Sequence, residues 1–210
     1  AMSDSTHVIN RPQALRDANE KFFTEQFPDC TPENLISRNI STLKQAVEEM
    51  KEVIVKPMDG MGGDSIFKTG VSDKNLNVIL ETVTQNGTKT AMIQKFIPAI
   101  SQGDKRILMI NGKPVPYALA RIPSSSDFRG NLAKGGTGKG LLLSNSDRRI
   151  CDIVGPKLKA MGIVFAGIDV IGEYLTEINV TSPTCIRELD KIFDLNIAAD
   201  LFECIEKDIL

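Results

Sequence analysis

Two apolar stretches with hairpin signatures limit the fold of this chain more than any other feature. The segment RILMINGKPVPYALARI contains Asn111-Gly112 between two strand-like runs, and this dipeptide favours the tight turn of a β-hairpin. The segment VFAGIDVIGEYLTEINV has the pattern of a second hairpin. Because helical periodicities alternate with these mostly antiparallel strands in two clusters, the sequence predicts an α+β protein with a seam near Pro98.

Apolar spacing and helix-breaking residues place the remaining elements. Expected helices cover residues 12–27 (one helix or two short ones), 42–52 with Ser41 as N-cap, 74–87, 144–161 and 194–208, and expected strands cover 53–55 and 91–97. Residues 122–140 are rich in glycine, serine and charge but poor in apolar side chains. This composition predicts a mobile loop.

Charge and hydropathy exclude two classes of partner. The 210 residues have a formal net charge of -2 at pH 7, which gives no basic field for a nucleic acid backbone. The longest apolar run, GIVFAGIDVIG, is interrupted by Asp169 and is too short to span a bilayer. We therefore expect no nucleic acid partner, no membrane partner and a cytoplasmic location.

The histidine and cysteine content excludes several kinds of chemistry. The single histidine, His7, leaves no imidazole base for a serine or cysteine nucleophile and no histidine-rich metal site. Cys30, Cys151, Cys185 and Cys204 form no CxxC pair, so they indicate neither a zinc site nor a disulfide framework, and we expect reduced thiols. The chemistry must use carboxylates, lysines, arginines and backbone amides.

The stretch KPMDGMGG at residues 56–63 has the composition of a phosphate-binding loop without its usual signature. No Lys-Ser/Thr follows these glycines, and in the later GGTGKG the first glycine of the P-loop pattern falls on Ala133, so the P-loop interpretation fails at both places. What remains is Lys56 at the end of a strand that leads into a short glycine loop. Such a loop can direct backbone amides and a lysine charge at phosphate, although an ordinary tight turn would look the same.

The second hairpin contains a set of polar residues in otherwise apolar strands. Asp169, Glu177 and Asn179 offer hard oxygen donors that suit Mg²⁺ bridging phosphates, and the alternative is a solvated polar strand face. Asp169 and Glu177 share a face only if the register is odd, which predicts a three-residue loop at Gly172-Glu173-Tyr174. Without metal, repulsion between these carboxylates should raise the pKa of at least one of them.

Several motifs in order resemble the bacterial glutathione synthetase family of ATP-grasp carboxylate-amine ligases. They are KPMDGMGG, QKFIPAI, GDKRILMINGKPVPYALARIP, RGNLAKGG and IDVIGEYLTEINVTSPTCIRE, and the resemblance extends from about Ile9 to the C-terminus. It implies an ATP-grasp fold, in which two α+β lobes hold the nucleotide between mainly antiparallel sheets. It also implies a reaction in which ATP phosphorylates the carboxylate of γ-glutamylcysteine and glycine then displaces the phosphate to give glutathione.

The resemblance assigns roles toward the nucleotide and the metal. Lys21 and Lys56 would contact phosphates. Gln94 with the backbone of Lys95 and Ile97 would frame adenine, and Asp104 would take the ribose hydroxyls. The implied nucleotide-binding set is Lys21, Lys56, Gly60, Met61, Gly62, Gly63, Gln94, Lys95, Phe96, Ile97 and Asp104. Asp169, Glu177 and Asn179 would hold Mg²⁺, for which Mn²⁺ could substitute.

The resemblance also implies roles toward the reacting groups. Arg106 and Arg121 would face phosphate and the reacting carboxylate, where charge grows in the transition state. Residues 122–140, with Arg129 and Asn131, resemble the lid that shields the acyl phosphate from water. The segment SPTCIRE resembles the peptide-substrate pocket through Ser182, Thr184 and Arg187, and Cys185 there is interpreted as a packing residue.

The family pattern divides the chain into three parts. Residues 1–17 would link to an N-terminal domain that is missing here, residues 18–97 would form the small lobe, and residues 98–210 the C-terminal lobe with its lid. The expected partners are γ-glutamylcysteine, glycine and further copies of the chain in a homo-oligomer. A nucleotide-binding fragment without turnover and another amino-acid ligase of the same fold stay open as alternatives.

Overall fold

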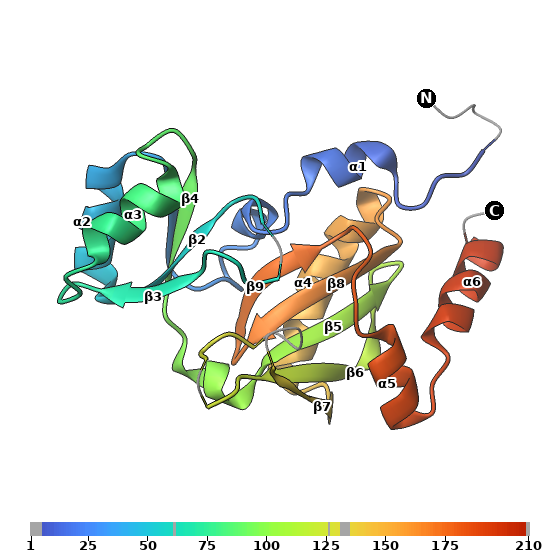
Figure 1. Cartoon of the computed structure of the whole chain (residues 1–210). Coiled ribbons are helices and arrows are strands. Elements are labelled where there is room, and N and C mark those ends of the chain that lie inside the picture. The colour runs from blue at the N-terminus through green and yellow to red at the C-terminus, as the bar shows by residue number, and fades with distance from the viewer. Residues whose placement is uncertain (1–5, 61, 126, 131–134, 209–210) are drawn as a thin grey trace. The chain divides into compact units, whose positions relative to one another are not determined.

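A computed structural model describes residues 6–60, 62–125, 127–130 and 135–208. The chain forms two compact units, a smaller one at Thr31–Pro98 and a larger one that combines Ala1–Cys30 with Ala99–Leu210 (Figure 1). The sequence interpretation instead assigned residues 18–30 to the small lobe. They lie in the larger unit because Phe23, Phe27 and Cys30 are buried in its core.

The smaller unit is a four-stranded antiparallel sheet with two helices on one face. Its elements are β1 (Asn34–Ser37), α2 (Ile40–Met50), β2 (Glu52–Pro57), β3 (Phe67–Gly70), α3 (Leu76–Thr84) and β4 (Ala91–Lys95), with strand order β1-β4-β2-β3. The apolar sides of α2 and α3 pack on Val53, Val55 and Ile93. Strand alternation therefore places Ile54, Lys56 and Gln94 on the opposite face.

The cap of α2 differs from the prediction. Ser41 lies inside the helix, and Asn39 is the N-cap, whose side-chain oxygen accepts a hydrogen bond from Thr42 N at 3.1 Å. Asparagine and serine both serve as N-caps, so composition alone does not choose between two neighbouring candidates. Ser41 Oγ donates to the Asn39 carboxamide and supports the cap.

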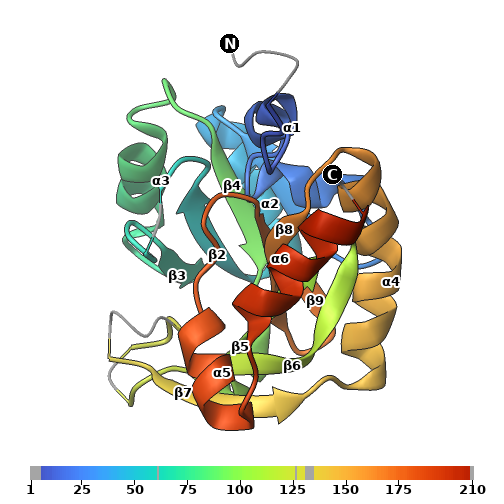
Figure 2. The same ribbon diagram turned by 90° about the vertical axis from the view of Figure 1, so that its right-hand side faces the viewer.

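The larger unit contains a five-stranded antiparallel sheet of order β7-β6-β5-β8-β9. Its elements are α1 (Pro12–Asp17), the 3-10 helix η1 (Phe22–Gln26), the 3-10 helix η2 (Pro98–Gln102), β5 (Asp104–Ile110), β6 (Lys113–Ile122), β7 (Thr137–Leu142), α4 (Asn145–Ala160), β8 (Phe165–Ile171), β9 (Tyr174–Asn179), α5 (Ile186–Phe193) and α6 (Ile197–Asp208). Figure 2 shows α4 and the pair α5 and α6 along this sheet. The helices α1 and η1 correspond to the second of the two alternatives predicted for residues 12–27, two short helices.

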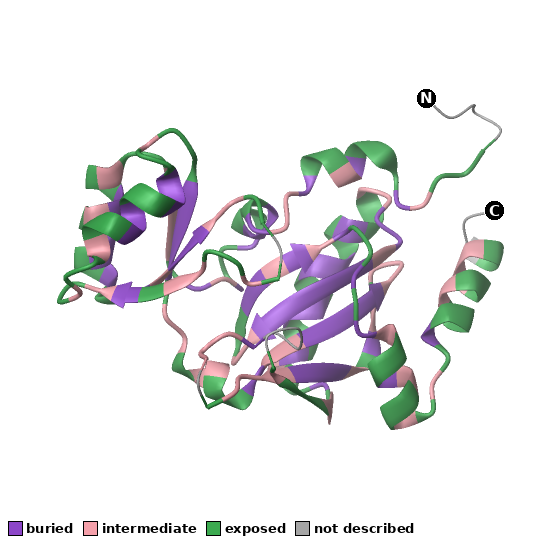
Figure 3. Cartoon of the chain, viewed as in Figure 1, coloured by how far each residue is buried: buried purple, intermediate pink, exposed green. Residues whose placement is uncertain are grey.

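Two apolar cores cover the two faces of the larger sheet, whose central strands are buried (Figure 3). Ile107, Met109 and Ile168 face α4, whereas Leu108 and Leu119 belong to a second core with Leu189 of α5 and Ile197 of α6. Because successive residues of a strand point to opposite faces, Asp104 and Arg106 lie on the face of Leu108. The charged residues of β5 therefore extend the face covered by α5 and α6.

The segment predicted as a mobile loop at 122–140 contains a strand. Residues 137–142 form β7, which pairs with β6 from Ile122↔Thr137 to Tyr117↔Leu142. Gly140 permits this pairing to continue beneath α5, because a Cβ there would lie 2.6 Å from the Phe193 ring. Glycine occurs both in flexible loops and in strands where another element approaches closely, so composition alone does not distinguish the two. The prediction of a loop is therefore wrong for this end of the segment.

Asn10 ties the N-terminal segment to the second hairpin. Its amide donates to Phe165 O at 2.7 Å and to Val180 O at 2.9 Å, and its carbonyl accepts from Val164 N and Phe165 N. All four bonds go to backbone groups at the open end of the β8–β9 hairpin. This buried side chain therefore fixes where the hairpin begins and ends.

No helix in the described part of the chain combines the length and apolar content that a membrane crossing requires. Cys30, Cys151, Cys185 and Cys204 all lie in the described ranges, and none of them forms a disulfide.

Candidate active site

Two arginines and two aspartates form a charged cluster on the larger sheet. Arg106 of β5 lies opposite Asp169 of β8 and binds it through Nε–Oδ1 at 2.5 Å and through Nη2–Oδ2 at 3.0 Å. Arg121 of β6 lies opposite Asp104 of β5, contacts its carboxylate, and reaches Asp169 Oδ2 at 3.0 Å. The three strands thus bring together two predicted catalytic residues, one nucleotide-binding residue and one metal ligand.

The β8–β9 hairpin brings its polar residues together through a register that differs from the predicted one. The loop has two residues, Gly172 and Glu173, so the predicted three-residue loop is wrong. Asp169 nevertheless lies opposite Glu177, because Thr176 is an extra residue that forms a β-bulge between the pairs Val170↔Leu175 and Asp169↔Glu177. The prediction that Asp169 and Glu177 share a face is confirmed.

The cluster separates the pKa values of its two carboxyl groups. Burial alone would raise the pKa of Asp169, but the charges of Arg106 and Arg121 outweigh it and lower the pKa to about 2. The pKa of Asp104 is raised to about 7 by burial, which Arg121 only partly offsets, and by repulsion from Asp169. The predicted pKa rise is therefore wrong for Asp169, because two guanidinium groups occupy the place that the prediction gave to a metal.

Asp104 has an acceptor atom without a partner among the described residues. Its Oδ2 binds Arg121, whereas Oδ1 is buried and receives no hydrogen bond from them. An unsatisfied buried carboxylate oxygen is costly unless a ligand hydroxyl or a water donates to it. Gly130 lies against this pair, since a Cβ there would be 2.4 Å from Arg121 O and 3.0 Å from Asp104 Cβ.

Lys21 and Asn179 complete the polar face around the hairpin. Lys21 is buried just before η1, forms an ion pair with Glu20, and places Nζ 3.9 Å from Glu177 Oε1. Asn179 donates its amide to Asp169 Oδ2 at 3.3 Å. The part of the chain that the structure describes has no group of three or more acidic, histidine or cysteine side chains arranged for a metal. A cation here would need the Asn179 carbonyl and ligand oxygens in addition to the two carboxylates.

Gly167 gives Arg106 its position, and the sequence analysis did not identify it as functional. It lies opposite Asn179 on the face of Asp169, and a Cβ there would be 2.8 Å from Arg106 Cδ and 2.9 Å from Pro183 Cβ. The absence of a side chain lets the arginine lie along β8 with the Ser182–Thr184 segment beside it. A lone glycine inside the apolar strand FAGIDVI is the signal that could have revealed this close approach.

Gly167→Ala should therefore displace Arg106 from Asp169. The new Cβ meets a rigid proline on one side and the arginine on the other, and a misplacement of about 1 Å can cost about 100-fold in turnover. We expect a loss of that order in kcat of the full-length protein with little change in its affinity for ADP. Steady-state kinetics and calorimetric ADP titration test this, and unchanged kcat would contradict the role given to Gly167.

In the smaller unit, Lys56 and Gln94 form a buried polar pair. Lys56 Nζ donates to Gln94 Oε1 at 3.2 Å, and both side chains lie on the sheet face opposite to α2 and α3. Asn34 of β1 lies directly opposite Gln94, and its Oδ1 is buried with no hydrogen-bond partner in the described ranges. Asn34 is a further candidate for ligand contact that the sequence analysis did not identify.

The glycine loop after Lys56 has the backbone conformation that its composition predicts. Gly60, Gly62 and Gly63 have φ values of 143°, 72° and 77°, a region that residues with side chains rarely adopt. Met61, also assigned to the nucleotide site, lies outside the described residues. The loop follows the strand that carries Lys56, as the motif requires.

The rest of the predicted adenine segment is more exposed. The Lys95 side chain pairs with Glu33 at 3.2 Å, Phe96 lies under the Lys68 ammonium group at 3.7 Å, and Ile97 is half-buried. None of these three side chains contacts Lys56 or Gln94 in a hydrogen bond or ion pair that the described residues show. The predicted role of Lys95 and Ile97 involves their backbone groups, of which the Lys95 amide donates to Glu33 O at 2.9 Å.

Among the described residues, the predicted lid and substrate side chains show no hydrogen bond or ion pair with the charged cluster, although Gly130 and Pro183 of these segments lie against it. Arg129 forms an ion pair with Asp127 of the same segment at 2.6 Å, and Asn131 lies outside the described residues. Ser182, Thr184 and Arg187 are exposed before and within the first turn of α5. Cys185 between them is buried in the core of α5 and α6, and burial raises the pKa of its thiol, in keeping with a packing role.

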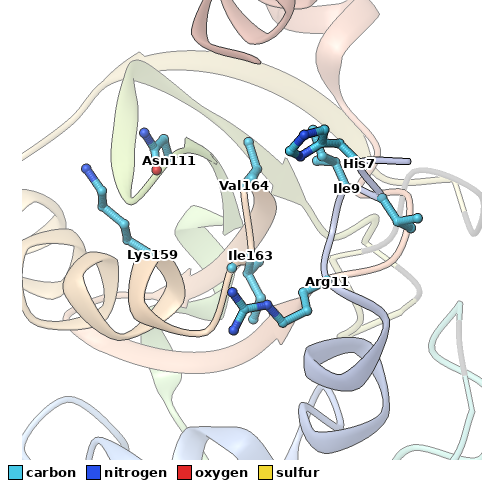
Figure 4. Close-up of a pocket in the computed structure, with 9 residues that line it drawn as sticks. His7, Ile9, Arg11, Asn111, Lys159, Ile163 and Val164 are labelled. Atoms are coloured by element: carbon cyan, nitrogen blue, oxygen red, sulfur yellow. The ribbon is translucent and has the colours of Figure 1, made fainter. Parts of the chain in front are cut away.

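A cavity of about 510 Å³ opens at the far end of the larger sheet (Figure 4). His7 and Arg11 lie on one side of it, and Asn111 and Lys159 on the other. It contains none of the predicted site residues, since the turn at Asn111 lies at the opposite end of β5 from Asp104. The chemistry of the cluster therefore does not depend on this cavity.

Several solved structures with a similar fold are ligases or synthetases. D-cycloserine synthetase DcsG superposes with a TM-score of 0.71 at 13% identity, covering 94% of this chain and 74% of that one. The ligase PsnB, solved with a minimal precursor, Mg and ADP, gives 0.68 at 16% identity over 95% and 61%, and D-alanine--D-alanine ligase from Bacillus anthracis with ATP gives 0.60 at 18% over 90% and 65%. The two antiparallel sheets with their helices thus define an ATP-grasp protein.

Sequence comparison identifies the family within that fold. The family model described as prokaryotic glutathione synthetase, ATP-grasp domain, matches residues 20–194, and the chain belongs to this family. It is 55% identical over 207 residues to the glutathione synthetase of Pseudomonas syringae and 56% identical over 198 residues to that of Pseudomonas aeruginosa. These matches cover 99% and 94% of this chain but 65% and 62% of the relatives, so the chain spans less than two thirds of their length.

Proposed function

We propose that this chain supplies the ATP-binding and catalytic part of a glutathione synthetase. The reaction transfers the γ-phosphoryl group of ATP to the free carboxylate of γ-glutamylcysteine and releases ADP. The glycine amine then attacks the acyl carbon, loses a proton, and displaces inorganic phosphate to give glutathione. The arginine–aspartate cluster is the observation that supports this best, because it gathers two fixed guanidinium groups where an acyl phosphate would need them.

Each group of the larger unit has a proposed role in this sequence. Arg106 and Arg121 would exchange their aspartate partners for the phosphoryl and carboxylate oxygens, where negative charge develops. Asp104 would accept a ribose hydroxyl through Oδ1, the atom that lacks a partner in the described residues. Lys21 would turn from Glu20 and Glu177 toward a phosphate. Ser182, Thr184 and Arg187 would bind the peptide, with Arg129 and Asn131 closing above it.

The smaller unit would bind the rest of the nucleotide. Lys56 would contact phosphate together with backbone amides of the loop at Gly60, Met61, Gly62 and Gly63. Gln94 would meet the base with the backbone of Lys95, Phe96 and Ile97. Asn34 would add a second amide at the same strand level.

The residues of the hairpin fit a magnesium ion. Asp169, Glu177 and Asn179 supply only oxygen donors once Asp169 is released from the arginines, and phosphates with water can complete six-fold coordination. These three residues would hold the ion, whose positive charge would offset the negative charge of the phosphates. Mn²⁺ accepts the same donors and should replace it.

Phosphate release by the full-length protein tests the proposal. We expect ATP-dependent release with γ-glutamylcysteine and glycine together, and little with either one alone. Equal release with other pairs of amino acids would instead favour another ligase of this fold, and nucleotide binding without release would favour a binding fragment.

Size-exclusion chromatography would test the proposed homo-oligomer. Fractionation of cells would test the proposed cytoplasmic location.

Lys56→Ala should weaken ATP binding far more than adenosine binding. Loss of a hydrogen bond to a charged group costs about 1.5–3 kcal/mol, or about one to two decades in Kd. Calorimetric titration of both ligands measures the difference. Lys95→Ala is the matched control, since its exposed ammonium group lies on a neighbouring strand of the same sheet. Equal losses for ATP and adenosine would remove Lys56 from the phosphate site.

A further inference from the structure

The β-bulge at Thr176 decides which face of the hairpin receives Glu177. With a two-residue loop, Val170 pairs with Leu175, and regular pairing would continue with Asp169 opposite Thr176. Glu177 would then lie opposite Ile168 and point into the core beneath α4. The bulge absorbs Thr176, so that Glu177 moves by one position and joins Asp169 on the polar face.

The side chain of Thr176 stabilises the bulged pairing directly. It is buried, and its hydroxyl donates to the carbonyl oxygen of Asp169 at 3.1 Å. This bond joins the extra residue to the residue whose carboxylate lies at the centre of the charged cluster. A valine would have nearly the same shape but could not form it.

Both ends of the hairpin are held by other side chains. Lys105 Nζ donates to Gly172 O in the turn at 3.0 Å and pairs with buried Asp147 of α4, whereas Asn10 binds the open end. Since the turn and the open end are fixed, the register between them can change only through the bulge. The position of Glu177 therefore depends on a single residue.

We propose that Thr176 is a positioning residue of the active site, which sets the Glu177 carboxylate opposite Asp169 and orients Asp169 through its carbonyl. The inference rests on the proposed function, because the two carboxylates are taken to bind the divalent cation of the nucleotide. Residues that orient metal ligands typically contribute about 10–100-fold to metal affinity. Thr176 is expected to contribute a factor of this size to metal affinity without contacting the metal or the substrate.

Thr176→Val and Thr176→Ser test the role of the hydroxyl. We expect Thr176→Val to weaken Mn²⁺ binding in the presence of ADP by about 10–100-fold, measured by electron paramagnetic resonance of free Mn²⁺. The affinity for ADP without metal should not change, and Thr176→Ser should restore Mn²⁺ affinity. Thr69→Val is the matched control, because Thr69 is also a buried strand threonine with one hydroxyl bond, to Asp73 in the smaller unit.

Deletion of Thr176 tests the register separately. Without this residue, the two-residue loop sets Asp169 against Glu177 with no bulge, so the deletion variant should bind Mn²⁺ more tightly than Thr176→Val although it too lacks the hydroxyl. Wild-type affinity in Thr176→Val, no rescue by serine, or a deletion variant no better than Thr176→Val would each overturn the inference. A wild-type protein that binds ADP but no Mn²⁺ with it would overturn the proposed function itself.

Discussion

Asp169→Asn is expected to lower the free energy of unfolding by about 2–4 kcal/mol at neutral pH in the absence of divalent metal. Removing one member of a buried ion pair costs about 3–5 kcal/mol, and asparagine retains part of the hydrogen bonding to Arg106 and Arg121. The folded-state pKa of Asp169, about 2 against the ordinary 3.8, gives about 2 kcal/mol on its own. We also expect the variant to lose turnover that depends on Mg²⁺.

The pH dependence of stability should reveal both carboxyl groups of the cluster. Because the folded-state pKa of Asp169 is lowered, its contribution is fully present above about pH 4 and is lost as the pH falls toward 2. The raised pKa of Asp104, about 7, has the opposite consequence: stability falls as the pH rises from about 4 to 7. The contribution of the cluster is therefore greatest near pH 4.

Asp169→Asn should abolish the acidic slope and reduce the basic slope, so the difference in stability between wild type and variant should change with pH. The acidic slope belongs to Asp169 itself, and the basic slope shrinks because Asp169 is one of the charges that raise the pKa of Asp104. Urea unfolding from about pH 3 to pH 8 in chelator measures this, with Asp152→Asn, an exposed carboxylate of α4, as control. Curves for wild type and Asp169→Asn that stay parallel over this range would show that the cluster does not couple these groups.

Local signals made much of the fold predictable. Asn111 and Gly112 have the positive φ values, 48° and 78°, that a tight hairpin turn between β5 and β6 requires. The glycines after Lys56 likewise have the conformations for which glycine is needed. The helix expected at 144–161 is present as α4, where Ser144 and Asp147 form a capping box. In each case the residues that determine the structure are neighbours in the sequence.

Pairing between distant strands made the rest of the site unpredictable. The contact of Arg106 with Asp169 depends on the register of β5 against β8, and no local pattern contains it. The spacing of two apolar residues in β9 does indicate the bulge. Leu175 and Ile178 both face the core beneath α4, although residues three apart in a regular strand point to opposite faces. That spacing indicates an extra residue and would have corrected the predicted loop.

Gly155→Ala is expected to destabilise the larger unit by about 3 kcal/mol or more, against the trend of helix propensity. Gly155 lies within α4, where alanine is ordinarily favoured over glycine by about 1 kcal/mol. A Cβ at this position, however, would lie 2.0 Å from the carbonyl oxygen of Gly112, and a Cβ on Gly112 would lie 2.6 Å from Gly155 O. Each of these close contacts is with a backbone carbonyl oxygen, so no side-chain rotation can relieve it.

The helix would have to move off the β5–β6 turn to accept the methyl group. This movement would open the core that α4 shares with the central strands, because Val154 and Leu158 pack beside the contact. For a chain of this size, about 3 kcal/mol corresponds to a fall in Tm of about 6–12 °C in calorimetry. Asp152→Ala, at an exposed position of the same helix, is the matched control and should leave Tm unchanged or slightly raised. A stabilised Gly155→Ala would mean that helix propensity outweighs the contact, and that α4 is not held against the turn by this pair of glycines.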